Sequence, residues 1–177
     1  MSKLTTRSWG TIRERLINFY APLLGAGIRS KKIDKNTIRV EMKLSALNRN
    51  IVGSHFGGSL YAMCDPWFML ILMRNLGPDY VVWDKAASIK FLMPGRGKVS
   101  ATFHVSEERI DQIREQAEGS QKIEPTFEVD VVDENNQTVA HIQKLLYIKN
   151  PLKKIEKCTK MEPFSDKLHM VKPDNIG

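Results

Sequence analysis

The sequence is short of the residues that build disulfide frameworks and metal sites. Its two cysteines, Cys64 and Cys158, stand far apart with no partner spacing, which supports neither a disulfide framework nor a cysteine-based zinc site. Gly25-Ala26-Gly27 lacks the third glycine of a dinucleotide-binding loop, and no Gly-x-Ser-x-Gly nucleophile motif occurs. The histidines show no metal-ligand spacing; they are His55, His104, His141 and His169. We therefore expect neither a metal nor a bound cofactor.

Long apolar runs are also missing. The most apolar stretch, 60–73, has 14 residues and contains Asp65 and Pro66, whereas a membrane-spanning helix needs about 20 apolar residues. Arginines interrupt the segment in which a signal peptide would be apolar; they are Arg7, Arg13 and Arg15. We therefore expect a cytoplasmic protein with no membrane partner.

Acidic residues are the minority, since 20 Asp and Glu stand against 27 Lys and Arg, for a net charge of +7. The excess is uneven: residues 1–50 carry 11 basic and 3 acidic side chains (+8), and residues 101–150 carry 5 and 10 (−5). A basic excess indicates an anionic partner, such as a nucleic acid, a phosphorylated small molecule or a membrane surface. Aromatic residues do not interleave with the basic ones, which argues against a nucleic-acid partner.

Hydrophobic periodicity divides the chain into three helices and six strands. The expected helices are an amphipathic one at 9–20, ended by Pro22, an apolar one at 59–75 and a charged one at 107–118. The expected strands lie within 25–33 and at 38–44, 81–91, 99–105, 127–131 and 139–148. Turns are expected at Pro94-Gly95 and at Asn135-Asn136.

The helix at 59–75 is apolar nearly all round, so it must be surrounded. A single antiparallel sheet curled about it does this, with the last four strands in two hairpin-like pairs. The expected fold class is therefore α+β, with one domain over residues 1–150 and an irregular extension at 151–177. An open sheet edge would be left for another subunit to cover.

Paired glycines at the start of this helix can carry chemistry. Gly57 and Gly58 allow a ligand to approach the backbone, and free N–H groups in the first turn of a helix stabilise a developing negative charge. Asp65 is the only acidic residue of the helix and suits a general base, because a buried carboxyl group has an elevated pKa.

Each of these features also has a purely structural explanation. The glycines can form a tight turn with close packing, and Asp65 before Pro66 has the form of a helix N-cap. His55 can order its loop through a hydrogen bond. An apolar cluster is core by default, although part of it could line an acyl pocket; it consists of Tyr61, Met63, Trp67, Phe68 and Met69.

The motif resembles the hotdog-fold thioesterases, especially the branch of phenylacetate-pathway acyl-CoA thioesterases. That branch has Asn before His-Gly-Gly and Asp after it, at the spacings found here: Asn50 stands eight residues before Gly58, and Asp65 seven after it. The stretch 55–61 with Asp65-Pro66 is also similar to a little-characterised, thioesterase-like hotdog family. The resemblance covers about residues 10–150.

The resemblance implies a hotdog fold and hydrolysis of an acyl-CoA substrate at the interface of a homodimer or dimer of dimers. It implies that the Gly58 N–H polarises the thioester carbonyl, that Asp65 of the neighbouring subunit activates water or attacks, and that Asn50 positions water or substrate. The residues expected to contact substrate are His55, Phe56, Gly57, Ser59, Tyr61, Arg96 and Lys98.

One departure from the pattern leaves alternatives open. The family's His directly precedes the glycines, whereas here Phe56 does and His55 stands one residue earlier. A non-catalytic hotdog protein that binds acyl groups or acts as a scaffold is therefore the main alternative. A hotdog hydratase is disfavoured, because no acid is paired with a catalytic His. We expect the phosphates of CoA to meet basic residues near the motif; the candidates are Arg49, Lys90, Arg96 and Lys98.

Overall fold

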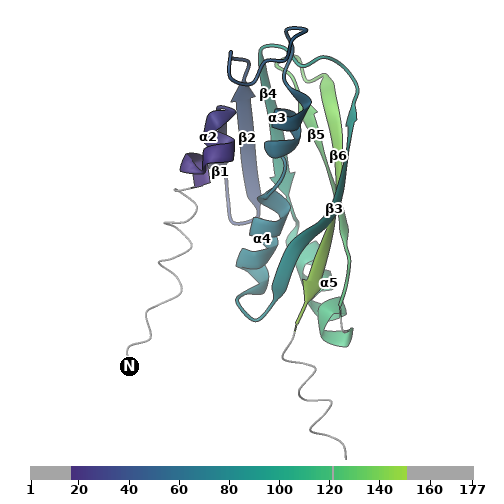
Figure 1. The fold of residues 1–177 in the computed structure, drawn as a ribbon. Helices are drawn as coiled ribbons and strands as arrows, with labels where there is room; N and C mark the ends of the chain where they lie inside the picture. The colour runs from purple at the N-terminus through teal and green to yellow at the C-terminus, as the bar shows by residue number, and fades with distance from the viewer. Residues whose placement is uncertain (1–16, 121, 151–177) are drawn as a thin grey trace, which may run out of the picture.

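The computed structural model describes residues 17–120 and 122–150 (Figure 1). In chain order the helices are η1 (Ile17–Phe19, a 3-10 turn), α2 (Ala21–Gly25), α3 (Gly57–Ala62), α4 (Trp67–Leu76) and α5 (Glu107–Gly119). The strands are β1 (Ile28–Lys32), β2 (Thr37–Lys43), β3 (Val81–Phe91), β4 (Lys98–His104), β5 (Thr126–Val132) and β6 (Thr138–Lys149). All six expected strands are confirmed, as is the charged helix. Most of the helix expected at 9–20, and the whole extension at 151–177, lie outside the described residues.

Pro22 begins a helix instead of ending one. It stands in the first turn of α2, after the chain has left η1 at Tyr20. Proline is tolerated in a first turn because the N–H that it lacks has no intrahelical partner there. The prediction that Pro22 ends a continuous helix was therefore wrong.

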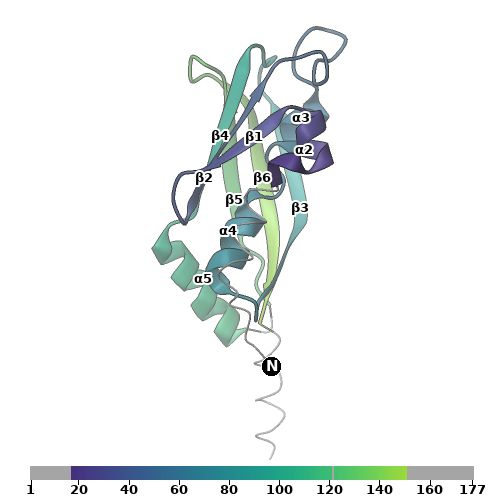
Figure 2. The ribbon, with the colours of Figure 1, turned by 90° about the vertical axis from the view of Figure 1, so that its left-hand side faces the viewer.

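The strands form one antiparallel sheet in the order β1-β2-β4-β5-β6-β3 (Figures 1 and 2). The β5–β6 hairpin was predicted correctly, and its turn places Asn136 at a φ of 59°. The expected hairpin of β3 with β4 is absent from the described sheet, because β3 pairs along its length with β6. The loop after β3 instead crosses the sheet: the N–H groups of Leu92 and Met93 donate to Val139 O, and Gly95 O accepts from His55 N.

The expected helix at 59–75 is divided into α3 and α4, which follow one another along the inner face of the sheet (Figure 1). Pro66 causes the break, because it has no N–H to donate to the carbonyl of Ala62. Asp65 does not cap the second helix: Pro66 occupies the N-cap position of α4, and no side chain there makes a capping bond. The N-cap interpretation of Asp65 is thus wrong, and its carboxylate is available for other contacts.

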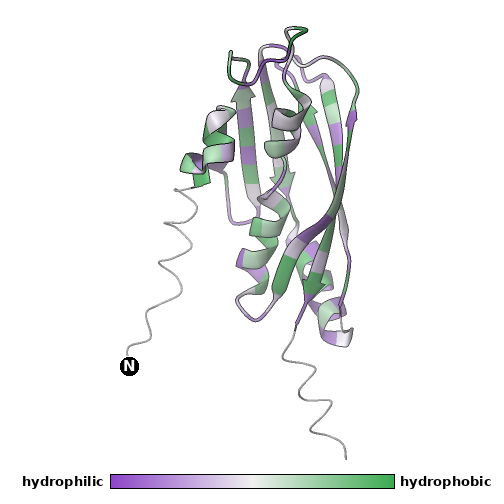
Figure 3. Cartoon of the chain, viewed as in Figure 1, coloured by the Kyte–Doolittle hydropathy of each residue, from purple (hydrophilic) through white to green (hydrophobic). Residues whose placement is uncertain are grey.

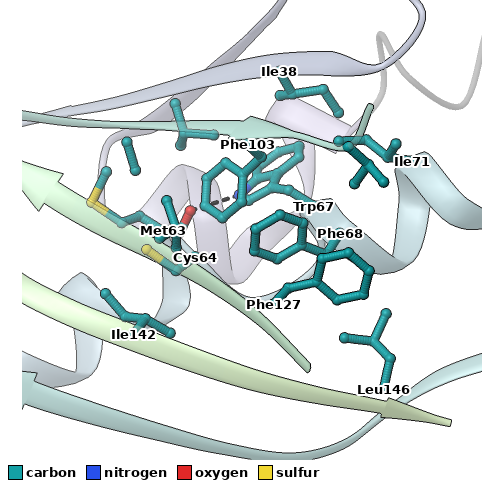
Figure 4. Packing of buried hydrophobic residues seen from close by; sticks show 14 of the residues in the cluster. Ile38, Met63, Cys64, Trp67, Phe68, Ile71, Phe103, Phe127, Ile142 and Leu146 are labelled. Carbon is teal, nitrogen blue, oxygen red and sulfur yellow. Dashed lines mark hydrogen bonds between the residues drawn. The ribbon is translucent and has the colours of Figure 1, made fainter. Parts of the chain in front are cut away.

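The core lies between these helices and the sheet. Trp67 and Phe68 at the start of α4 meet Phe103 of β4, and Phe68 also stacks on Phe127 of β5 with ring centroids 4.9 Å apart (Figure 4). The Trp67 indole donates to Met63 O at 2.6 Å, which joins the two sides of the helix break. Each such buried side chain stabilises the fold by about 1.5–3 kcal/mol. The prediction that Met63, Trp67 and Phe68 belong to the core is confirmed.

Apolar and polar residues alternate along the strands, so one set of side chains points to this core and the other set points away from it (Figure 3).

Among the described helices, none combines the length and the apolar character needed to span a membrane. In the same part of the chain, His, Cys, Asp and Glu side chains form no group of three or more that could hold a metal ion.

Candidate active site

The glycine motif follows a loop that two asparagines hold in shape. Asn48, almost fully buried, donates through Nδ2 to Ala26 O at 2.8 Å and to Lys43 O at 2.9 Å, which ties the loop to the end of α2 and to the end of β2. Asn50 donates to Ser54 Oγ at 2.9 Å and accepts from Ser54 N at 3.0 Å. Both ends of its side-chain amide therefore make hydrogen bonds within the loop. A role for Asn50 in positioning water or substrate stays a prediction.

His55 is clamped between the loop and the segment that precedes β4. Its backbone N–H donates to Gly95 O at 2.9 Å, and its ring Nε2 lies 3.2 Å from Gly97 O. Because a carbonyl only accepts, the ring carries its proton on Nε2. The other ring nitrogen, Nδ1, is buried and has no hydrogen-bond partner among residues 17–120 and 122–150. Burial lowers the pKa of His55, against the opposing effect of the Gly97 bond, so the neutral ring is favoured.

The paired glycines lie close to two phenyl rings. A Cβ on Gly57 would lie 2.8 Å from Phe91 Cζ, and a Cβ on Gly58 would lie 2.4 Å from Phe56 Cε1. This packing supports the structural explanation of the two glycines and is compatible with a binding role. Phe56 O accepts from the N–H groups of Ser59 and Leu60, so this first turn begins its bonding after the N–H groups of Gly57 and Gly58.

Asp65 lies at the helix break and meets a lysine from β6. Lys144 Nζ lies 3.1 Å from Asp65 Oδ1, 3.0 Å from Asp84 Oδ2 and 3.4 Å from Tyr61 Oη. The Lys144 side chain is 0% exposed, whereas that of Asp65 is 51% exposed. A buried ammonium thus holds one carboxylate inside the sheet, Asp84, and one at the surface, Asp65.

The electrostatics of this cluster follow from burial and from the two carboxylates. Burial alone would lower the pKa of Lys144, but bonding to Asp84 and the charges of Asp84 and Asp65 hold that pKa above its ordinary value. Burial raises the pKa of Asp84 against the opposing effect of Lys144. Burial also raises the pKa of Cys64 to about 12, so this thiol is not a nucleophile at neutral pH.

Two cavities flank these groups. The larger, of about 670 Å³, is lined chiefly by apolar and aromatic side chains of η1, α2, α3 and α4, with Asp65 as its charged residue. The smaller, of about 450 Å³, is lined by Asn50, His55 and Gly57 together with the end of β3. Within the described chain, Asp65 and Gly57 therefore face different cavities.

The sequence matches a protein-family model described as Domain of unknown function (DUF4442) over residues 11–148. The chain belongs to this family. No curated protein matches the sequence.

Solved structures share the fold of this DUF4442 chain. A protein of unknown function from Pseudomonas aeruginosa, described as a probable thioesterase, is 22% identical with a TM-score of 0.70, over 78% of this chain and 94% of that one. The E. coli PaaI protein from the phenylacetic acid degradation operon is 22% identical with a TM-score of 0.57, over 82% and 95%. A thioesterase from Haemophilus influenzae is 15% identical with a TM-score of 0.58, over 85% and 94%. The expected hotdog fold is confirmed.

The other predicted site residues of the DUF4442 chain are spread around the two cavities. Tyr61 lines the larger cavity beside Asp65. Ser59 is buried in α3, and Phe56 is 57% exposed. Arg96 is exposed between Gly95 and Gly97, the two residues whose carbonyls contact His55. Lys98 lies on β4, 3.9 Å from Glu41 Oε1. Their contacts with substrate stay predictions.

Sequence reasoning missed Lys144 and Asp84. Inward positions of β6 alternate as Ala140, Ile142, Lys144, Leu146 and Ile148. A lone lysine in an otherwise apolar inward series was the available signal, because a lysine is almost never fully buried unless it is paired. Asp84 gave a weaker signal, since a bulge between Asp84 and Ala86 interrupts the alternation of β3.

Proposed function

We propose that the protein hydrolyses an acyl-CoA thioester to the free acid and CoA. The observation that carries the proposal is the setting of Asp65: a carboxylate with a half-exposed side chain, held by a buried ammonium, on the wall of a cavity that is otherwise apolar. Such a carboxylate is accessible to water and faces room for an acyl chain. The solved structures that share the fold include proteins described as thioesterases, which supports the same activity.

In this mechanism Asp65 acts as general base or nucleophile. As base, it takes a proton from water while the water oxygen bonds to the thioester carbonyl carbon. The oxyanion that forms is stabilised by the Gly58 N–H. The intermediate then collapses, the C–S bond breaks, and the CoA thiolate leaves and takes up the proton.

We further propose that the site is completed by a second copy of the chain, in a homodimer or dimer of dimers. Asp65 and Gly57, the neighbour of the proposed donor Gly58, line different cavities. This supports the arrangement, because within one copy the carboxylate and the glycine motif do not share a cavity. The edge strand β3 supports it too: Val81, Trp83 and Phe91 are 39%, 46% and 55% exposed on an eleven-residue edge strand. A long exposed apolar edge is a surface that another chain commonly covers.

The remaining predicted residues take supporting roles in the proposal. Asn50 and His55 shape the loop that presents the glycines, and Phe56, Gly57 and Ser59 surround the thioester. Tyr61 borders the acyl chain in the larger cavity. The exposed cations Arg49, Lys90 and Arg96, with Lys98, would receive the phosphates of CoA.

A non-catalytic acyl-binding role is the second candidate. The observation that favours it concerns Phe56, which stands where the resembled family has its histidine. The Phe56 ring lies so close to Gly58 that a Cβ added there would meet it. Under this alternative, acyl-CoA would bind with a measurable Kd, by isothermal titration calorimetry, and no thiol would be released.

Thiol release from acetyl-, hexanoyl-, palmitoyl- and phenylacetyl-CoA tests the proposal directly. We expect turnover of at least one substrate and a loss of roughly 100-fold or more in kcat for Asp65→Asn. Asp79→Asn, an exposed carboxylate in the turn between α4 and β3, is the matched control and should leave kcat unchanged. Turnover that survives Asp65→Asn would contradict the mechanism, and no turnover on any substrate would favour the binding role.

A further inference from the structure

Lys144 has a setting that the proposed mechanism does not use. All three of its N–H donors have an acceptor in range: Asp84 Oδ2 at 3.0 Å, Asp65 Oδ1 at 3.1 Å and Tyr61 Oη at 3.4 Å. The ammonium also lies 5.3 Å from the centroid of the Tyr61 ring. Its position is therefore defined from three directions, by β3, by the helix break and by α3.

We propose that Lys144 is the positioning residue for Asp65: it fixes the direction of the Asp65 carboxylate by binding Oδ1, which leaves Oδ2 to take the proton from water. Lys144 does not touch substrate, because its side chain is fully buried. The inference rests on the proposed function, since it assigns the orientation of the proposed base.

The energetics of burial argue that the fold alone does not account for Lys144. Taking an ammonium out of water is costly, and replacing a buried ion pair by apolar residues is often neutral or stabilising. Asp84 alone would provide an inner counter-ion, yet the amine also reaches the half-exposed Asp65. The contact joins the buried Lys144 amine to the Asp65 carboxylate on the cavity wall. It restrains the orientation of that carboxylate, which water molecules around it would not do.

The restraint is anchored in the sheet. Lys144 sits in the middle of β6, and Asp84 stands beside the bulge in β3, where Lys85 is the extra residue between Asp84 and Ala86. Strand β3 is the edge at which we place the second subunit. The charged and titratable groups that face Lys144 are Asp84 from β3, Asp65 from the helix break, Tyr61 from α3 and the buried Cys64.

A substitution of Lys144 alone would lower both the stability of the fold and the activity, because it would leave Asp84 as a buried carboxylate without its counter-ion. The two effects could then not be separated. The double variant Lys144→Met/Asp84→Asn removes both charges and keeps the side-chain volumes close. We expect it to fold with a Tm near that of the wild type, while kcat falls roughly 10- to 100-fold with little change in KM, because Asp65 has lost its orientation. Lys31→Met, which removes an exposed cation from β1 at the opposite edge of the sheet, is the matched control.

The split between kcat and KM separates positioning from mere support of the fold. Lys144 does not touch substrate, so loss of its ammonium should lower kcat and leave KM nearly unchanged in the folded double variant. A folded double variant with the wild-type kcat would overturn the inference and leave the proposed function standing. A wild type that releases no thiol, or an active Asp65→Asn, would overturn the proposed function and the inference with it.

A second variant covers the case in which the double variant does not fold. Lys144→Arg keeps the positive charge but displaces the donor atoms, so kcat should fall with little change in KM. A folded Lys144→Arg with the kcat of the wild type would overturn the inference, because it would show that the geometry of the amine is irrelevant.

Discussion

The ring of Phe56 occupies the space that a side chain on Gly58 would need: an added Cβ would lie 2.4 Å from Phe56 Cε1. Phe56 replaces the histidine of the resembled motif, so the glycine here is matched to a phenyl ring. The two residues should therefore respond to substitution as a coupled pair.

Gly58→Ala should lower the free energy of unfolding by about 1 kcal/mol, because the exposed Phe56 ring can swing away at modest cost. Phe56→Ala should remove most of that penalty, giving a coupling energy of about 0.5–1 kcal/mol in a double-mutant cycle measured by urea unfolding. Gly25→Ala is a control for glycine loss alone, since nothing lies within 4 Å of an added Cβ there and its φ is not positive. Additive effects of the Phe56 and Gly58 substitutions would contradict the contact.

His55 should make the fold sensitive to mild acid. Its pKa is lowered in the folded state by burial, so the unfolded chain binds more protons once the pH falls to about 6.5. The stability contributed by the neutral ring is complete above that pH and is lost as the pH falls through 6.5 toward the folded-state pKa. As the pH is lowered from 8 to 5, Tm should fall less steeply for His55→Gln than for the wild type. Equal slopes for His55→Gln and the wild type would contradict the assignment.

Local patterns were sufficient to predict the strands and to select Asp65 as a candidate. Strand β2 alternates buried Ile38, Val40 and Met42 with outward residues, which is the periodicity of a half-buried strand and is legible without any partner. Asp65 could be selected because a single carboxyl group in an apolar segment is costly to bury unless it has partners or a function.

Features that depend on distant residues could not be predicted in the same way. The pairing of β3 with β6 joins residues such as Ala87 and Lys144, whose separation in the chain gives no local signal. For the same reason the partners of Asp65 were not predicted, because the Lys144 that binds it comes from the last strand. The helix break at Pro66 was visible in the sequence, but the apolar run on both sides outweighed it in the prediction of a single helix.

The exposed edge of β3 should control activity through assembly. Ala87 is exposed in the middle of β3, and a glutamate there would place like charges close together wherever two copies of this edge meet. Ala87→Glu should therefore shift the mass measured by sedimentation velocity from dimer to monomer. Thiol release should fall at least roughly tenfold in parallel, because each cavity would keep only half of the site. Gln116→Glu, which adds the same charge to the exposed face of α5, is the control; a monomeric and fully active Ala87→Glu would rule out a shared site.

The larger cavity should set the preference for acyl chain length. Ala62 and Leu70 contribute to its wall beside Asp65, so Ala62→Leu adds bulk where an acyl chain would lie, without adding a polar group. We expect the ratio of kcat/KM for palmitoyl-CoA to that for acetyl-CoA to fall by about tenfold, since apolar pockets discriminate by roughly 1–3 kcal/mol for a methylene that no longer fits. Ala46→Leu makes the same chemical change at an exposed position in the loop after β2 and should leave the ratio unaltered. A ratio that is equal in Ala62→Leu and the wild type would place the acyl chain elsewhere, whereas a loss on both substrates alike would indicate that the added bulk disturbs Asp65 itself.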